Sequence, residues 1–163
     1  MLHYITNSFW NFYRKDQKTS NHHELVLYAP LFFQDKLSRR HTAGLFVTCK
    51  CCGIVVQIDE IAGSKTISQT LGCICELVSQ MTEESRRKFK IWMYDDICHL
   101  APHAENCKDS TETTKFFAEL PKAVDNFHHK NHLKSDKYCQ ENTNPKIELK
   151  KFGIDKVNSQ ACE

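Results

Sequence analysis

Hydrophobic residues are grouped into short runs along the chain, and the spacing within each run predicts a secondary structure. The apolar runs at residues 45–49 and 54–58 stand on either side of a tight connection that contains Gly53. Two such runs joined by a short glycine-containing turn are typical of a β-hairpin. Beyond the hairpin, apolar residues recur every three or four positions from Ile67 to Val78, as they do on the buried face of a helix. The pattern therefore predicts an antiparallel hairpin followed by an amphipathic helix of roughly four turns.

Two further apolar runs predict strands. Residues 89–94 have the pattern of a buried strand that stops abruptly at Asp95 and Asp96. Residues 25–29 have the β-branched and aromatic content of a short strand, but Pro30 follows them directly. Because proline cannot donate a hydrogen bond to a neighbouring strand, we expect residues 25–29 to lie at an edge of the sheet or to end at the proline.

The predicted elements follow one another as strand, strand, helix, strand, helix, strand. After the strand that ends at Asp95, helical or irregular chain is expected up to Pro121, then a short strand at residues 123–127 and a last amphipathic segment from about Ile147. An antiparallel hairpin that leads into strand–helix–strand crossovers defines a mixed α/β sheet with flanking helices. We expect the hairpin and everything after it, residues 41–163, to form this core. Residues 1–40 would form an N-terminal arm and edge segment.

The composition favours a single domain. The chain has 163 residues, and hydrophobic residues make up 40% of it, which is enough for one core of ordinary size. Its formal net charge is only +2, so the field of the whole molecule does not attract nucleic acid or an anionic membrane. Contacts to DNA phosphates would have to come from local groups of basic residues, although such runs more often form a solvated face. The candidates are Arg39, Arg40, Lys130 and Lys134.

The cysteine count indicates a reducing compartment. Nine cysteines is a high and odd number, which argues against a fully paired disulfide framework. Residues 1–7 lack the basic and apolar regions of a signal peptide, and no apolar run approaches the length that spans a bilayer. We therefore expect an intracellular protein with no membrane partner, in which cysteines are free thiols or metal ligands.

The end of the strand at residues 89–94 is a first candidate site. The carboxylate of Asp95 would lie at the carboxyl end of a buried strand, where α/β sheets form their ligand crevice. In two-metal phosphoryl transfer, carboxylates from different elements hold two divalent ions, and oxygen ligands of this kind suit Mg²⁺ or Mn²⁺. The plainer alternative is that Asp95 and Asp96 begin a loop or cap the next helix.

Histidines and cysteines form a second candidate site. His128 and His132 are four positions apart, an interval that places two side chains on one face of an α-helix. Together with Cys98 and Cys139 they could make a tetrahedral zinc site, although their spacing matches no standard zinc-finger pattern. Histidines near an aspartate can instead bind a phosphate or orient a water molecule, and ordinary surface histidines are a third alternative.

Taken in chain order, several of these segments resemble the Kyakuja-Dileera-Zisupton transposases, whose catalytic domain has a ribonuclease H-like fold. The resemblance covers roughly residues 41–163. The segments that carry it are His41-Thr42-Ala43-Gly44-Leu45-Phe46-Val47 with Cys52-Gly53-Ile54, Tyr94-Asp95-Asp96-Ile97-Cys98-His99-Leu100, Val124-Asp125-Asn126-Phe127-His128 with Asn131-His132 and Cys139, and Val157-Asn158-Ser159-Gln160-Ala161-Cys162-Glu163.

This resemblance implies a cut-and-paste DNA transposase that works in the nucleus, with an acidic triad that binds Mg²⁺ or Mn²⁺. Asp95 would be the acid at the strand end, and Glu163 would be the closing acid. The fold normally supplies its first acid from the first strand of the sheet. Residues 25–33 contain no acid, and Asp35, just beyond them, is the nearest substitute.

The resemblance also assigns Asp125 and Asn131, with His128 and His132, to an element that would support the site or bind metal. The chain stops at the last acid, Glu163, so the resemblance implies an incomplete core. We therefore expect a transposon-derived, transposase-like protein of DNA-cutting and DNA-joining ancestry that is inactive as this fragment. The alternative is a non-catalytic DNA- or protein-binding module that is stabilised by zinc.

Overall fold

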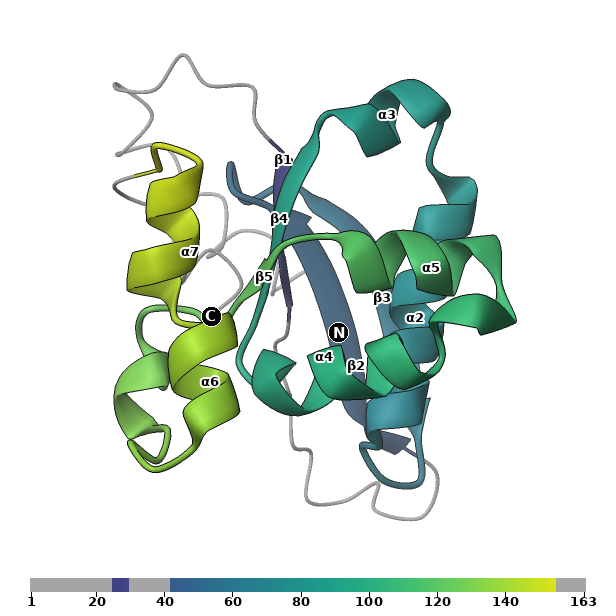
Figure 1. Ribbon diagram of the computed structural model, residues 1–163. Helices are drawn as coiled ribbons and strands as arrows, with labels where there is room; N and C mark the ends of the chain where they lie inside the picture. The colour runs from purple at the N-terminus through teal and green to yellow at the C-terminus, as the bar shows by residue number, and fades with distance from the viewer. Residues whose placement is uncertain (1–24, 30–41, 155–163) are drawn as a thin grey trace, which may run out of the picture.

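A five-stranded sheet forms the centre of the molecule. The structure, a computed structural model, describes residues 25–29 and 42–154. The sheet has the order β3-β2-β1-β4-β5, with antiparallel pairing from β3 to β1 and parallel pairing from β1 to β5 (Figure 1). The strands are β1 (Leu25–Ala29), β2 (Thr42–Lys50), β3 (Val55–Ala62), β4 (Phe89–Tyr94) and β5 (Lys122–Ala123). The predicted mixed α/β sheet with an antiparallel hairpin is therefore confirmed.

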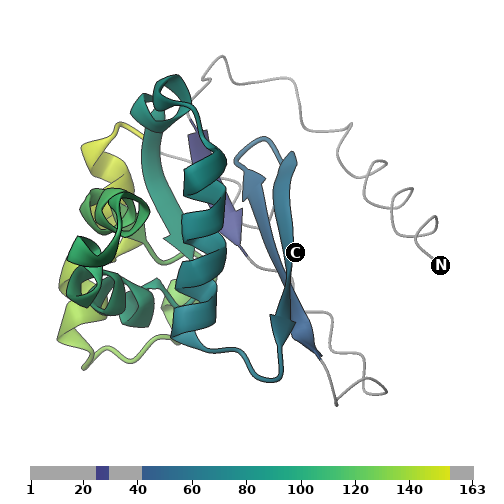
Figure 2. The same cartoon turned by 90° about the vertical axis from the view of Figure 1, so that its right-hand side faces the viewer.

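Helices lie on both sides of this sheet. In Figure 1, α7 lies on one side of β4 and β5, and α2, α4 and α5 lie on the other; Figure 2 shows α2 running alongside the strands. The helices are α2 (Ile67–Gln80), α3 (Glu83–Arg87), α4 (Ile97–Asn106), η1 (Lys108–Ser110), α5 (Glu112–Glu119), η2 (His128–Asn131), α6 (Lys137–Asn142) and α7 (Pro145–Lys151).

β2 and β3 form the predicted hairpin. Val47 pairs with Ile58 across the two strands. The chain turns at Gly53, which has a φ of 79°, a conformation that glycine adopts without strain. The Gly53 N–H donates a hydrogen bond of 2.7 Å to the carbonyl of Lys50 and so closes the turn. The glycine that marks the connection in the sequence is therefore required by the backbone conformation.

β1 lies in the middle of the sheet, so an edge position, the first of the two expected alternatives, is wrong, whereas the second, a strand that ends at the proline, is confirmed. Leu27 is paired with Lys50 of β2, and Ala29 is paired with Tyr94 of β4. Pro30 comes directly after the last paired residue, so its missing N–H removes no hydrogen bond from the strand ladder. Because the pairing with β4 is parallel, the carboxyl ends of β1 and β4 lie side by side.

The alternating side chains of β4 separate two hydrophobic clusters. Trp92 and Tyr94 are buried in the cluster that contains the apolar faces of α2, α4 and α5. Ile91 and Met93 belong to the cluster on the opposite face, which includes Leu149 of α7. Successive side chains of a strand point to opposite faces of the sheet, so a strand that is covered on both faces needs a continuous apolar run. This requirement explains why residues 89–94 were recognisable as a buried strand.

α2 buries the apolar face that the spacing predicts, except at its first residue, Ile67, which is 36% exposed. Leu71, Ile74 and Val78 are buried, as their spacing indicates. The N-cap is Thr66, whose hydroxyl accepts a hydrogen bond from the backbone N–H of Gln69 at 3.2 Å. Capping by threonine therefore sets the start of the helix.

β5 is shorter than the predicted strand at residues 123–127, since it ends at Ala123. Two residues further on, the carboxylate of Asp125 accepts hydrogen bonds from the backbone N–H groups of Phe127 and His128 at 2.8 and 3.0 Å. An aspartate side chain that accepts hydrogen bonds from the next backbone N–H groups stabilises a turn. Those N–H groups are then not available to pair with a neighbouring strand. Asp125 therefore helps to end the strand and to begin η2.

Candidate metal centre

Three of the predicted zinc ligands come together at one end of the molecule. Cys98 lies in the first turn of α4, His132 directly follows η2, and Cys139 lies in the first turn of α6. The Nδ1 atom of His132 is 3.5 Å from the Sγ atom of Cys98 and 3.1 Å from the Sγ atom of Cys139. The three ligand atoms all lie within 4.8 Å of one another. Segments that are far apart in the sequence therefore present two thiols and an imidazole to one point.

These distances match those expected around a single metal ion. Zinc binds sulfur at about 2.3 Å and nitrogen at about 2.0 Å, so two tetrahedral ligands of these kinds lie about 3.5 Å apart. Cys98 and Cys139 are buried, and His132 is half-buried. Burial raises the pKa of Cys98, and the neighbouring Cys139 raises it further. A metal ion would supply the positive charge that such a buried thiol needs to ionise, so this cluster could hold a metal ion.

Local hydrogen bonds hold the cysteine of α6 in place. Asp136 is the N-cap of α6, and its carboxylate accepts a hydrogen bond of 3.0 Å from the backbone N–H of Cys139. Cys98 is held by α4, whose buried residues Ile97, Leu100 and Ala101 anchor it in the core. The thiol of Cys139 therefore comes from a helix with a capped start, and that of Cys98 comes from a helix anchored in the core, which is favourable for a metal site.

His128, the fourth ligand in the sequence hypothesis, does not join this cluster. Its Nδ1 atom is 2.5 Å from the Oδ2 atom of Asp125, whose side chain is completely buried. Residues 128–131 form a 3₁₀-helix, in which residues four apart are rotated by about 120° from one another. His132 follows this helix in extended backbone, so the expectation that His128 and His132 share one face of an α-helix is wrong.

Asp95 lies directly after β4, as predicted, and contacts a lysine. Its Oδ1 atom is 3.9 Å from the Nζ atom of Lys65, which also lies 5.0 Å from the centre of the Tyr94 ring. The same oxygen accepts a hydrogen bond of 2.8 Å from the backbone N–H of Asp96. Burial raises the pKa of Asp95, whereas Lys65, this N–H and the nearby His128 act in the opposite direction. Burial is the largest of these effects, so the pKa of Asp95 stays above its ordinary value.

Asp96 and His99 are two residues that the sequence hypothesis missed. The Nδ1 atom of His99 hydrogen-bonds the carboxylate of Asp96 and lies 3.7 Å from the Sγ atom of Cys98. The hydrogen bond to Asp96 raises the pKa of His99. Asp96, Cys98 and His99 form a second group whose ligand atoms lie within 4.8 Å of one another. The signal in the sequence was an Asp-x-Cys-His segment at the start of a helix.

The remaining predicted site residues are exposed or lie outside the described residues. Lys130 and Asn131 are exposed residues of η2, and Lys134 is exposed just after it. The side chains offered for the first and last acids and for the first basic group, namely Asp35, Glu163, Arg39 and Arg40, lie outside the described residues. The thiol and imidazole donors of the metal cluster do not suit Mg²⁺ or Mn²⁺, so the expectation of these ions gains no support there.

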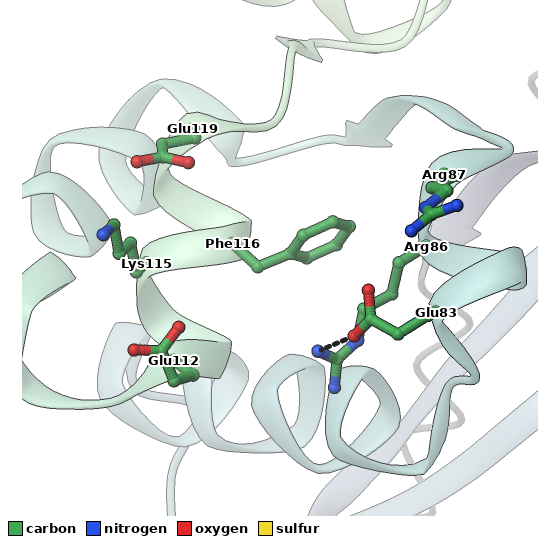
Figure 3. Close-up of a pocket in the computed structure, with 7 residues that line it drawn as sticks. All are labelled: Glu83, Arg86, Arg87, Glu112, Lys115, Phe116 and Glu119. Atoms are coloured by element: carbon green, nitrogen blue, oxygen red, sulfur yellow. Dashed lines mark hydrogen bonds and ion pairs between the residues drawn. The ribbon is translucent and has the colours of Figure 1, made fainter.

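A shallow pocket of about 310 Å³ lies elsewhere, between α3 and α5 (Figure 3). The ring of Phe116 projects from α5 towards Arg86, whose guanidinium carbon lies 5.8 Å from the ring centre. Arg86 also pairs with Glu83 at 3.2 Å. This pocket is lined by neither cysteine nor histidine, so it is separate from the metal cluster.

Comparison with known proteins adds no relative. No protein-family model, no curated protein and no solved structure matches the chain. Within the described ranges, no helix has both the length and the apolar character needed to cross a bilayer.

Proposed function

We propose that this chain is a transposase-like domain of ribonuclease H-like fold that holds a structural zinc ion and binds DNA without cutting it. The observation that carries the proposal is the position of Asp95, directly after β4 and beside the carboxyl end of a first strand that has no acid. The proposal joins the resemblance of the sequence to the transposases with the geometry of the strand end.

The order of the strands supports the fold assignment. Three antiparallel strands, β1 to β3, come first in the chain. β4 then pairs parallel with β1, and β5 pairs parallel with β4. A meander of this kind that leads into parallel crossovers is the arrangement expected of a ribonuclease H-like sheet. α2 lies between β3 and β4 in the chain, and α4 and α5 form the crossover that the parallel pairing of β4 with β5 requires.

Two features support the loss of strand cleavage. A two-metal site needs carboxylates from different elements, but residues Leu25–Ala29, which end beside Tyr94, include no aspartate or glutamate. In addition, Lys65 lies 3.9 Å from Asp95, so a fixed positive charge stands beside the carboxylate. A divalent ion bound by Asp95 would be repelled by this ammonium group.

The zinc ion would fasten the C-terminal part of the domain to the core. Cys98 belongs to α4, whereas His132 and Cys139 belong to the segment that follows β5. Between β5 and α6 the chain forms only one short 3₁₀-helix, so a metal ion would replace the missing secondary structure. Structural zinc sites contribute directly to folding in this way.

The segment fastened by the metal offers a basic surface for DNA. Lys130, Lys134 and Lys137 are exposed within eight residues of one another, and Phe127 beside them is 48% exposed. Lysines neutralise phosphates, and an exposed aromatic ring can stack on a base. A protein partner is the second candidate for this surface. The cluster of lysines favours DNA as the partner.

A nicking assay tests the proposed loss of cleavage. Supercoiled plasmid is incubated with the full chain and Mg²⁺ or Mn²⁺, beside the Asp95→Asn variant. We expect neither protein to nick DNA above the buffer control. Metal-dependent nicking by the wild type that disappears in Asp95→Asn would show a working acidic site and would refute the proposed loss of activity.

A binding assay tests the DNA contacts. Fluorescence anisotropy with a labelled duplex is measured over a series of salt concentrations for the wild type and for a Lys130→Glu/Lys134→Glu variant. Each lost phosphate contact reduces the slope of log affinity against log salt by about 1, so the double variant should lose about 2. Lys115→Glu, an exposed lysine of α5, is the matched control and should leave the slope unchanged. Salt-independent binding by the wild type would count against the proposed phosphate contacts.

A further inference from the structure

Phe127 is an exposed aromatic residue in the segment that follows β5, and it is 48% exposed. Among the described side chains, the only other exposed ring of a phenylalanine, tyrosine or tryptophan is that of Tyr138, in the same segment. Single apolar residues on a surface are common, but here both exposed rings lie among exposed lysines. Aromatic rings beside a positively charged surface are typical of proteins that bind single-stranded nucleic acid.

The exposed Phe127 is held in place by the buried Asp125. Its backbone N–H donates a hydrogen bond of 2.8 Å to the carboxylate of Asp125, which is completely buried. The same carboxylate holds the ring of His128, and that ring makes a T-shaped contact with the ring of Phe127, with 5.2 Å between the two centres. A side chain that is already fixed loses little conformational freedom when a ligand binds. The ring of Phe127 is therefore suited to stack on a flat partner.

η2 places a lysine beside this ring. Phe127 is the N-cap of η2 and has helical backbone angles, and Lys130 follows it by three positions in the same 3₁₀-helix. Residues three apart in a 3₁₀-helix eclipse one another, so Phe127 and Lys130 lie on one side of η2, about 6 Å apart along its axis. Lys130 is also exposed. The two side chains are therefore placed to contact the base and the phosphate of one nucleotide.

The exposed charges of this segment are positive. Residues 126–140 contain three lysines, Lys130, Lys134 and Lys137, and all three are exposed. The single acidic residue in this stretch is Asp136, whose carboxylate caps α6 by accepting a backbone N–H of its first turn. The lysines therefore complement a phosphate backbone, and the exposed ring beside them complements the face of a base.

A base must be unpaired to use such a ring. Bases inside a duplex have both faces covered by their neighbours, whereas the bases of a single strand can be splayed out and stack on an aromatic side chain. We propose that this surface recognises single-stranded DNA, with Phe127 stacked on an unpaired base and Lys130 on the phosphate of that nucleotide. This role depends on the proposed DNA binding and adds the form of DNA that the surface takes.

Fluorescence anisotropy of the full chain with three labelled probes tests this role. The probes are a strand of thymidines, an abasic sugar-phosphate strand of the same length, and a duplex. Phe127→Ala should weaken binding to the thymidine strand by about 5- to 150-fold, the contribution of stacking on one base. It should bind the abasic strand and the duplex as the wild type does. Leu133→Ala, which removes another exposed apolar side chain of this segment, is the matched control and should bind all three probes like the wild type.

The salt dependence separates the ring from the lysine. Phe127→Ala should leave the slope of log affinity against log salt unchanged, whereas Lys130→Gln should reduce it by about 0.7 on the single strand. Phe127→Tyr keeps the ring and should keep the affinity. If Phe127→Ala binds the thymidine strand like the wild type, or weakens strand and duplex equally, the stacking role is overturned while DNA binding stands. If the wild type binds none of the probes, the proposed DNA binding is refuted and the stacking role with it.

Discussion

Lys122 offers a test of the packing between β5 and its neighbours, because a buried lysine makes stability depend on pH. It is the first residue of β5 and its residue surface is only 8% exposed. Its Nζ atom donates hydrogen bonds of 2.8 and 2.6 Å to the carbonyl oxygens of Ala118 and Leu120, and it lies 4.9 Å from the centre of the Phe117 ring. Burial lowers the pKa of this lysine from 10.5 to about 8.

The size of the effect follows from the two pKa values. Below pH 8 the folded protein must keep a charged amine in the core, which costs about 3 kcal/mol relative to the unfolded chain. Because the folded pKa is lower than the unfolded pKa, this cost disappears as the pH rises from 8 to 10.5. Between pH 7 and pH 9.5 it should fall by about 2 kcal/mol.

The perturbation is Lys122→Met, which keeps the length of the side chain and removes the charge. Urea unfolding at several pH values between 7 and 9.5 gives the free energy of unfolding of both proteins, and their difference removes the contributions of other titrating groups. We expect the advantage of the variant over the wild type to shrink by about 2 kcal/mol across this range. A difference that stays constant with pH would refute the reasoning, since Lys122 would then titrate equally in both states.

Three further substitutions test the fold and are read by urea unfolding. Thr111→Ala removes the N-cap of α5 and should cost about 1 kcal/mol; no change would show that the cap is dispensable. Phe117→Ala removes a fully buried ring that lies edge-on to Trp92 and should cost about 3 to 5 kcal/mol; a cost near 1 would contradict this packing. Asp125→Asn removes the charge that holds His128 and should cost about 1.5 to 3 kcal/mol; a neutral result would disprove that role.

The elements that were predictable from the sequence are those whose patterns are local. Residues 89–94 form β4 at the predicted positions, and the hairpin turns at Gly53, because strand alternation and turn chemistry are written in neighbouring residues. The central position of β1 was not predictable in this way. It depends on pairing with β4, about sixty positions later. Pro30 allowed either an edge position or a strand that ends before it, and only the folded chain shows that β1 ends there in the middle of the sheet.

The same distinction applies to the candidate site. The residue types of Cys98, His132 and Cys139 suggested a metal site, and the folded chain brings their ligand atoms together. His128 was chosen because its spacing was read as that of an α-helix, whereas residues 128–131 form a 3₁₀-helix. His99 was overlooked although it is adjacent to Cys98. Only the folded chain shows its ring beside that thiol and the carboxylate of Asp96.

The zinc content of the intact protein tests the account most directly. Native mass spectrometry of the full chain, purified without chelator, should show one zinc ion per molecule that is released on acidification, because protons compete for thiolates and imidazoles. The Cys98→Ala/Cys139→Ala variant should have the metal-free mass, while Cys52→Ala, which changes an exposed cysteine of the hairpin turn, should keep its zinc. A metal-free wild type, or zinc that is retained in the double variant, would contradict the proposed metal centre.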